Sequence, residues 1–174
     1  MTRLKLGILT KVNDNPYEGL NENHINNKNH IKWARDVAAK SIVLLKNKNN
    51  TLPLSKNINR LFITGPNAAN VNTLLANYNG LSPNMVTPLE GITTKVSNGT
   101  MIRFNEGVGL ISDNNRMDWS ASLAGSSDVT IAIMGISALI EGEEGAAISS
   151  DANGDRNTIC LLYTSPSPRD PLWS

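Results

Sequence analysis

The chain has 174 residues, with 16 Lys and Arg against 15 Asp and Glu, and its formal net charge is +1. A nearly neutral chain has no electrostatic footprint for nucleic acid or an anionic membrane, so we expect neither as a partner. The single Cys excludes a disulfide framework, and no apolar stretch approaches the roughly 18 residues of a bilayer span.

The first 28 residues are polar and rich in Asn, and Asn15-Pro16 marks a turn. We expect residues 1–28 to be a linker, without the apolar region of a signal peptide at its start. A helix is predicted over His30–Lys46, because apolar residues recur there at three- and four-residue spacing. Asn47–Asn50 ends this pattern.

Short apolar runs and helix signals then alternate along the chain. A Thr cap, Pro at the first helical position and Glu three residues after the cap predict a helix start at Thr87-Pro88-Leu89-Glu90. Predicted strands are Arg60–Thr64, Met101–Phe104 and Val129–Ile136. The helix that starts at Thr87 is predicted to end near Val96, and further helical segments are predicted over Val71–Ala76 and Asp118–Ala124. Strands separated by helices indicate βαβ units, so the predicted fold class is α/β, with a mostly parallel sheet flanked by helices over residues 29–159.

The last fifteen residues, 160–174, differ from the rest of the chain. They hold Pro166, Pro168 and Pro171, the only Cys, and no periodicity. They look like translated sequencing-adapter read-through, and we exclude them from the fold as a non-native tail. The alternative is a disordered tail rich in Pro and Ser.

Ligands of open parallel sheets bind outside the carboxyl ends of the strands, which directs attention to two loops. The loop after Thr64 carries Tyr78 and Asn79, whose phenol and amide suit sugar hydroxyls; the alternative is a plain turn at Asn79-Gly80. This loop lacks both nucleotide-binding glycine motifs, so no nucleotide cofactor is expected.

The loop after Ile136 carries Glu141 and Glu143, followed by further acidic residues. Clustered carboxylates raise one another's pKa, as a general acid requires, and a solvated acidic loop is the alternative. The spacing around Asp151 and Asp155 does not fit a calcium loop. His24 and His30 are far apart in the sequence, and neither shows the spacing of a metal site or of a Ser–His–acid triad. We therefore expect no metal and no cofactor.

Several segments resemble family 3 glycoside hydrolases, most of all the β-xylosidase branch and its β-glucosidase-like bacterial relatives. They are AAKSIVLLKNKNNTLPLS (Ala38–Ser55), ITGPNAANV (Ile63–Val71), NYNGLSPNMVTPLEGI (Asn77–Ile92), SDVTIAIMGIS (Ser127–Ser137), EGEEG (Glu141–Gly145) and GDR (Gly154–Arg156).

The resemblance implies a two-domain enzyme: a barrel that carries a nucleophilic Asp, followed by a C-terminal α/β sandwich. This chain resembles the linker that leaves the barrel and the first part of the sandwich, so we expect the barrel to be its missing partner and the chain alone to be inactive.

The implied reaction removes β-linked xylose or glucose from a β-glycoside or oligosaccharide with retention of the anomeric configuration. The resemblance places it in the periplasm or outside the cell. Glu141 or Glu143 is the implied acid/base, although other branches place it further along the sandwich. Tyr78 and Asn79 fall where an aromatic residue can wall the sugar site, but no Trp stands there. The competing hypothesis is a non-catalytic α/β carbohydrate-binding module. A third hypothesis is a generic α/β scaffold whose acidic loop is solvated surface.

Overall fold

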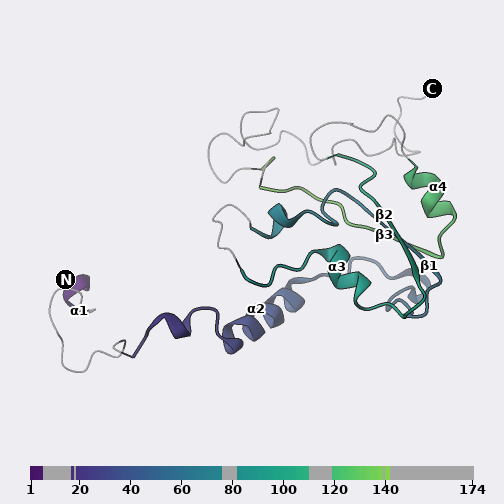
Figure 1. The fold of residues 1–174 in the computed structure, drawn as a ribbon. Coiled ribbons are helices and arrows are strands. Elements are labelled where there is room, and N and C mark those ends of the chain that lie inside the picture. The colour runs from purple at the N-terminus through teal and green to yellow at the C-terminus, as the bar shows by residue number, and fades with distance from the viewer. Residues whose placement is uncertain (6–16, 18, 76–81, 110–118, 139, 142–174) are drawn as a thin grey trace. The chain divides into compact units, whose positions relative to one another are not determined.

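The computed structural model describes residues 1–5, 17, 19–75, 82–109, 119–138 and 140–141. The chain forms two compact units, Met1–Pro53 and Leu54–Ser174 (Figure 1). The predicted tail, 160–174, lies outside the described residues.

The first unit is built from short helices: α1 (Thr2–Lys5), η1 (Glu22–His24), α2 (Lys28–Ser41) and η2 (Lys48–Asn50). Helix α2 begins before the predicted residue, because the Asn27 side chain accepts hydrogen bonds from two free backbone N–H groups of the first turn. The prediction that it continues to Lys46 is wrong. Ile42 is already extended, and the β-branched pair Ile42-Val43 favours that conformation.

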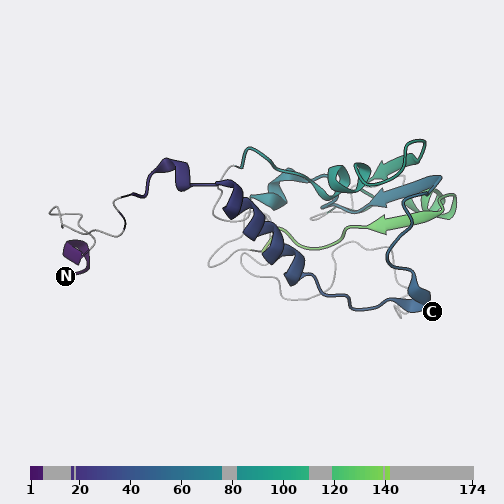
Figure 2. The same ribbon diagram turned by 90° about the horizontal axis from the view of Figure 1, so that it is seen from below.

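The second unit contains a parallel sheet with strand order β2-β1-β3 (Figure 2). Leu61 of the central strand lies opposite Ile102 on one side and Val129 on the other. The elements are β1 (Arg60–Thr64), η3 (Val71–Leu74), α3 (Pro88–Thr93), β2 (Met101–Asn105), α4 (Ser120–Gly125) and β3 (Val129–Ala132). This arrangement confirms the predicted α/β class.

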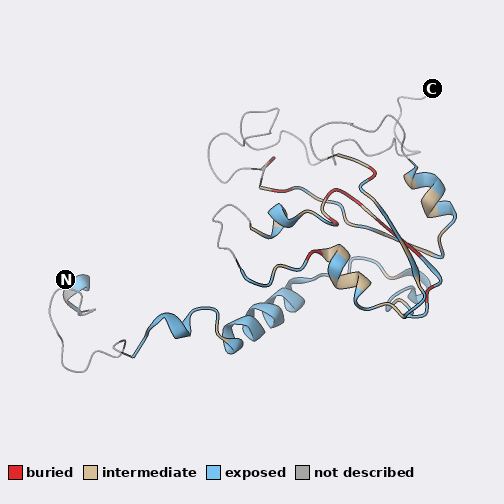
Figure 3. Cartoon of the chain, in the orientation of Figure 1, coloured by how far each residue is buried: buried red, intermediate tan, exposed pale blue. Residues whose placement is uncertain are grey.

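The core is centred on β1, which is buried on both faces (Figure 3). Leu61 and Ile63 point to one face, where Leu89 and Ile92 from α3 pack against them. Phe62 points to the other face and is 0 % exposed. A nearly continuous apolar run is what a doubly covered parallel strand requires.

The predicted start of α3 is confirmed in atomic detail. The Thr87 backbone N–H donates to Glu90 Oε2 over 2.7 Å, and the Glu90 N–H donates back to Thr87 Oγ1. The hydrogen bond from the Thr87 backbone, and then that from its hydroxyl, lower the pKa of Glu90. The helix ends at Thr93, earlier than predicted.

Strand β3 ends at Ala132, although the apolar sequence predicts a strand up to Ile136. Gly135 has a φ of +152°, a conformation that L side chains rarely adopt. The chain leaves the sheet sooner than its hydropathy indicates, and the segment after β3 carries the predicted acid/base.

Candidate functional site

The strand order places two loops side by side at one end of the sheet. An order beginning 2-1-3 is that of doubly wound sheets, whose ligands bind outside the carboxyl ends of β1 and β3. Here those ends lead into residues 65–68 and into residues 133–138 and 140–141. We call these two segments together the carboxyl edge.

The loop after β1 is held tightly against the start of the loop after β3. Gly65 has a φ of +111°, and a β-carbon at this position would collide with the backbone carbonyl of Ile133. The Ile133 N–H donates to the Thr64 carbonyl over 2.8 Å. The Leu89 N–H donates to the Ala68 carbonyl over 2.9 Å, which fixes the other end of the loop to α3. Backbone hydrogen bonds therefore hold the loop at both of its ends.

The segment after β3 forms a tight turn that ends at Glu141. The Ser137 carbonyl accepts hydrogen bonds from the backbone N–H groups of Ile140, over 3.0 Å, and Glu141, over 3.1 Å. Ile140 is only 2 % exposed and anchors the turn, whereas Glu141 is half-buried. A carboxyl group on an anchored turn, partly open to solvent, can exchange a proton with a bound molecule.

Two buried oxygens at the carboxyl edge have no hydrogen-bond partner among the described residues. They are Oδ1 of Asn67, in the loop after β1, and Oγ of Ser137, at the start of the turn. Asn67 lies against the second loop, because a β-carbon at Gly135 would stand 3.4 Å from its Nδ2. Buried polar atoms are nearly always paired, so these two require an explanation.

The end of β2 adds a further acidic residue to the same end of the sheet. The carbonyl of Glu106 accepts the N–H of Gly65 over 3.0 Å and, more weakly, the hydroxyl of Thr64 over 3.4 Å. The Glu106 residue itself is exposed. Its backbone thus supports the loop after β1, while its side chain is free to face solvent.

The structure places one of the four predicted site residues. Glu141 lies at the carboxyl edge, as its position after a predicted strand indicated. Glu143, Tyr78 and Asn79 lie outside the described residues, so their roles stay predictions. The sequence analysis did not predict Asn67, Ser137 or Glu106 as site residues. Their positions just after the ends of strands were visible in the sequence, but those positions do not show whether a side chain is buried.

Two classes of feature are absent from the described part of the chain. No group of three or more His, Cys, Asp or Glu side chains there is arranged to hold a metal ion. No helix among those residues has the length and apolar character needed to cross a membrane.

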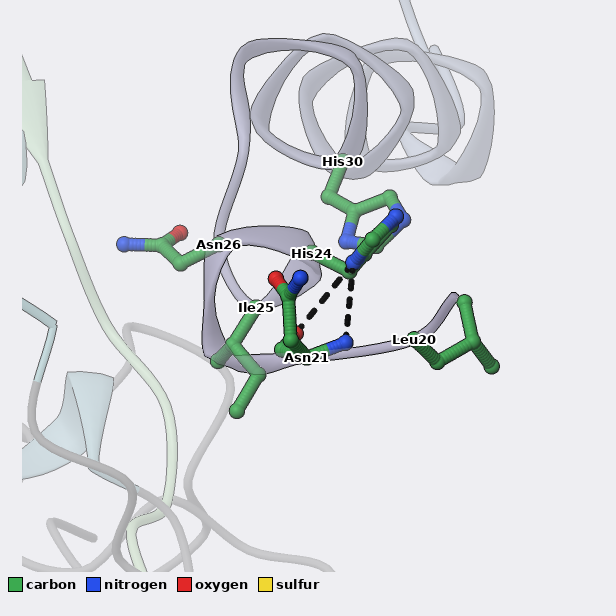
Figure 4. Close-up of a pocket in the computed structure, with 6 residues that line it drawn as sticks. All are labelled: Leu20, Asn21, His24, Ile25, Asn26 and His30. Carbon is green, nitrogen blue, oxygen red and sulfur yellow. Dashed lines mark hydrogen bonds between the residues drawn. The ribbon is translucent and has the colours of Figure 1, made fainter. Parts of the chain in front are cut away.

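A separate hollow of about 700 Å³ lies within the first unit, between η1 and the start of α2 (Figure 4). Its lining consists of Leu20, Asn21, His24, Ile25, Asn26 and His30. His24 Nδ1 accepts the Asn21 backbone N–H over 3.1 Å, so this ring caps its own short helix. Both histidines are exposed, and no Asp, Glu, Cys or Ser is among the residues that line the hollow.

Known proteins match this chain in both sequence and structure. The model of the glycosyl hydrolase family 3 C-terminal domain matches residues 42–165. A probable β-D-xylosidase 7 from Arabidopsis thaliana is 31 % identical over 97 % of this chain and 24 % of its own length. A xylan 1,4-β-xylosidase from Xylanibacter ruminicola is 50 % identical over 36 % of this chain and 7 % of its own length.

The chain also resembles a solved structure of a GH3 exo-β-xylosidase in complex with a xylobiose aziridine activity-based probe. The TM-score is 0.55 at 29 % identity, over 73 % of this chain and 15 % of that one. The chain thus spans less than a quarter of the length of these relatives. The parallel sheet and the family match agree: the chain belongs to glycosyl hydrolase family 3.

Proposed function

We propose that this chain is part of a retaining, exo-acting β-glycosidase, and that Glu141 is its acid/base. The observation that carries the proposal is the anchored turn that holds Glu141 at the carboxyl edge, outside the ends of β1 and β3. Glu143, two residues further along the same acidic loop, is the second candidate.

A retaining glycosidase uses two carboxyl groups about 5–5.5 Å apart. In the first step one attacks the anomeric carbon, while the other donates its proton to the departing glycosidic oxygen. In the second step the latter takes a proton from water, which displaces the sugar from the enzyme. Glu141 supplies the proton-transferring group in this scheme, and an Asp of a preceding barrel supplies the nucleophile.

The proposed substrates are β-xylosides, with β-glucosides second. The relatives reported above are named xylosidases, which supports this order. Tyr78 and Asn79 are proposed to contact the sugar, since a phenol and an amide suit neutral hydroxyl groups. Oligosaccharide substrates of this kind are met outside the cytoplasm, so we propose a periplasmic or secreted enzyme.

The test is acid/base replacement in the full-length enzyme. We expect Glu141→Ala to lower kcat on nitrophenyl β-xyloside by about 10²–10⁴-fold, because no group remains to exchange the proton. Added azide should restore part of the rate by attacking the glycosyl-enzyme without base help. Glu143→Ala is the matched control, expected to respond less and to gain nothing from azide.

Three outcomes would contradict the proposal in different ways. Unchanged activity of Glu141→Ala together with azide rescue of Glu143→Ala would move the role to Glu143. Unchanged activity of both variants would move it to a carboxyl group further along the sandwich. A full-length protein that binds oligosaccharides without hydrolysing them would favour the carbohydrate-binding module instead.

The isolated chain provides a further check. We expect it to release no nitrophenol from β-xyloside or β-glucoside, because the nucleophile belongs to the barrel. Measurable turnover by the purified chain, abolished by a mutation within it, would contradict the assignment of the nucleophile to the barrel.

A further inference from the structure

The two unpaired oxygens of the carboxyl edge lie in the segments that hold Glu141 in place. Ser137 opens the turn that ends at Glu141, and its carbonyl already accepts the Glu141 N–H over 3.1 Å. The Ser137 residue is 9 % exposed, and its Oγ has no partner among the described residues. A buried hydroxyl without a partner is less favourable for folding than a methyl group of the same shape. Fold stability alone therefore does not explain a serine at this position.

Asn67 supports the same turn from the neighbouring strand end. Its Nδ2 lies where it faces Gly135, two residues before Ser137, and its Oδ1 is buried and unpaired within the described part of the chain. The loop that carries Asn67 is fixed by the close approach of Gly65 to Ile133. Movement of this side chain is thus tied to the position of the turn.

The chemistry of an acid/base gives the unpaired Ser137 hydroxyl a role. Such a carboxyl alternates between a protonated form, which needs an acceptor, and an ionised form, which needs a donor. A serine hydroxyl can serve as either, and an amide oxygen accepts only. The Ser137 hydroxyl, at the start of the turn that ends at Glu141, can therefore serve a carboxyl on this turn in either protonation state.

We propose that Ser137 is a positioning residue for the Glu141 carboxyl, and that Asn67 supports it through Gly135. This inference rests on the proposed function. When a glycoside is bound, the Ser137 hydroxyl bonds to the Glu141 carboxyl and keeps it directed at the glycosidic oxygen. It makes no contact with the sugar itself.

The test compares two leaving groups in the full-length enzyme and its Ser137→Ala and Asn67→Ala variants. A poor leaving group, such as a phenol, needs protonation in the transition state, whereas dinitrophenol departs without it. We expect Ser137→Ala to lower kcat/KM by about tenfold for phenyl β-xyloside and by less than about twofold for the dinitrophenyl β-xyloside. Asn67→Ala should change the two substrates in the same direction by a smaller factor.

Ser122→Ala, on the exposed surface of α4, is the matched control and should leave both rates unchanged. The unfolding temperature of Ser137→Ala should equal or exceed that of the parent, because only an unpaired hydroxyl is removed. An equal loss on both substrates, a lowered unfolding temperature, or no loss at all would overturn the inference and leave the proposed function standing. A parent enzyme that hydrolyses neither substrate would overturn both.

Discussion

At the scale of single residues, the missing side chain of Gly65 brings the two loops of the carboxyl edge together. Its φ is +111°, and an added β-carbon would meet the carbonyl carbon, the nitrogen and the oxygen of Ile133. These are backbone atoms of a segment that is itself hydrogen-bonded to Thr64, so they cannot rotate away as a flexible side chain could. Glycine is thus required here for two independent reasons, conformation and space.

We expect Gly65→Ala to lower the free energy of unfolding by about 1–3 kcal/mol, because it adds strain at a positive φ and displaces a neighbouring backbone. Urea unfolding of the purified chain at low protein concentration, followed by circular dichroism, measures the change. Gly125→Ala is the control. No atom lies within 4 Å of its added β-carbon, at the last residue of α4, so stability should be unchanged or raised by up to about 1 kcal/mol. Equal stability of parent and Gly65→Ala would show that the two loops do not meet as described.

At the scale of elements, Asp128 joins the starts of β1 and β3 at the end of the sheet opposite the carboxyl edge. Its Oδ1 accepts from Arg60 Nη2 over 3.0 Å, and its Oδ2 accepts the Arg60 backbone N–H over 2.9 Å. Arg60 Nε also donates to Oδ1, over 3.3 Å, and the Asn59 N–H donates to Oδ2, over 3.2 Å. The side-chain hydrogen bond from Arg60, followed by that from its backbone, lowers the pKa of Asp128 below the usual 3.8.

The sign of the resulting pH dependence follows from that shift. The folded protein favours the ionised carboxyl, so the stability that Asp128 adds is fully present above its usual pKa and is lost as the pH falls through the lower folded value. We expect Asp128→Asn to reduce the urea midpoint at about pH 7 and to flatten its decline toward about pH 2.

Asp36→Asn is the matched control for this prediction. Asp36 is exposed on α2 and has no ion pair within the described residues, so its replacement should alter neither the midpoint nor its pH profile. A parallel decline with acid in Asp128→Asn and in the parent would contradict the assignment of that pH dependence to Asp128.

At the scale of the whole molecule, the sequence predicted what depends on local pattern and missed what depends on packing. The apolar run of β1 and the capping box of α3 were readable, because each acts within a few neighbouring residues. The shortened β3 was not, since the end of a strand depends on its pairing with β1, whose residues are distant in sequence. For the same reason Glu141 could be named as a candidate from its loop, whereas Ser137 could not, because only the fold reveals its burial.

The sheet also has consequences for how the isolated chain behaves in solution. Within the described residues β2 and β3 are its edge strands, each paired to β1 on one side. Unpaired strand edges favour pairing between molecules, and an added Lys on such a strand opposes it. We therefore expect the apparent mass of the isolated chain to rise with concentration in size-exclusion chromatography with light scattering.

Thr130→Lys should move that rise to higher concentration, because Thr130 is exposed on the edge strand β3 and a Lys on an edge strand opposes pairing between molecules. Ser122→Lys adds the same charge on exposed α4 and should leave the association as it is in the parent. If the two Lys variants shift the association equally, net charge and not the edge of β3 controls it. If the parent stays monomeric at every concentration, the open edges of the sheet are covered within the chain itself.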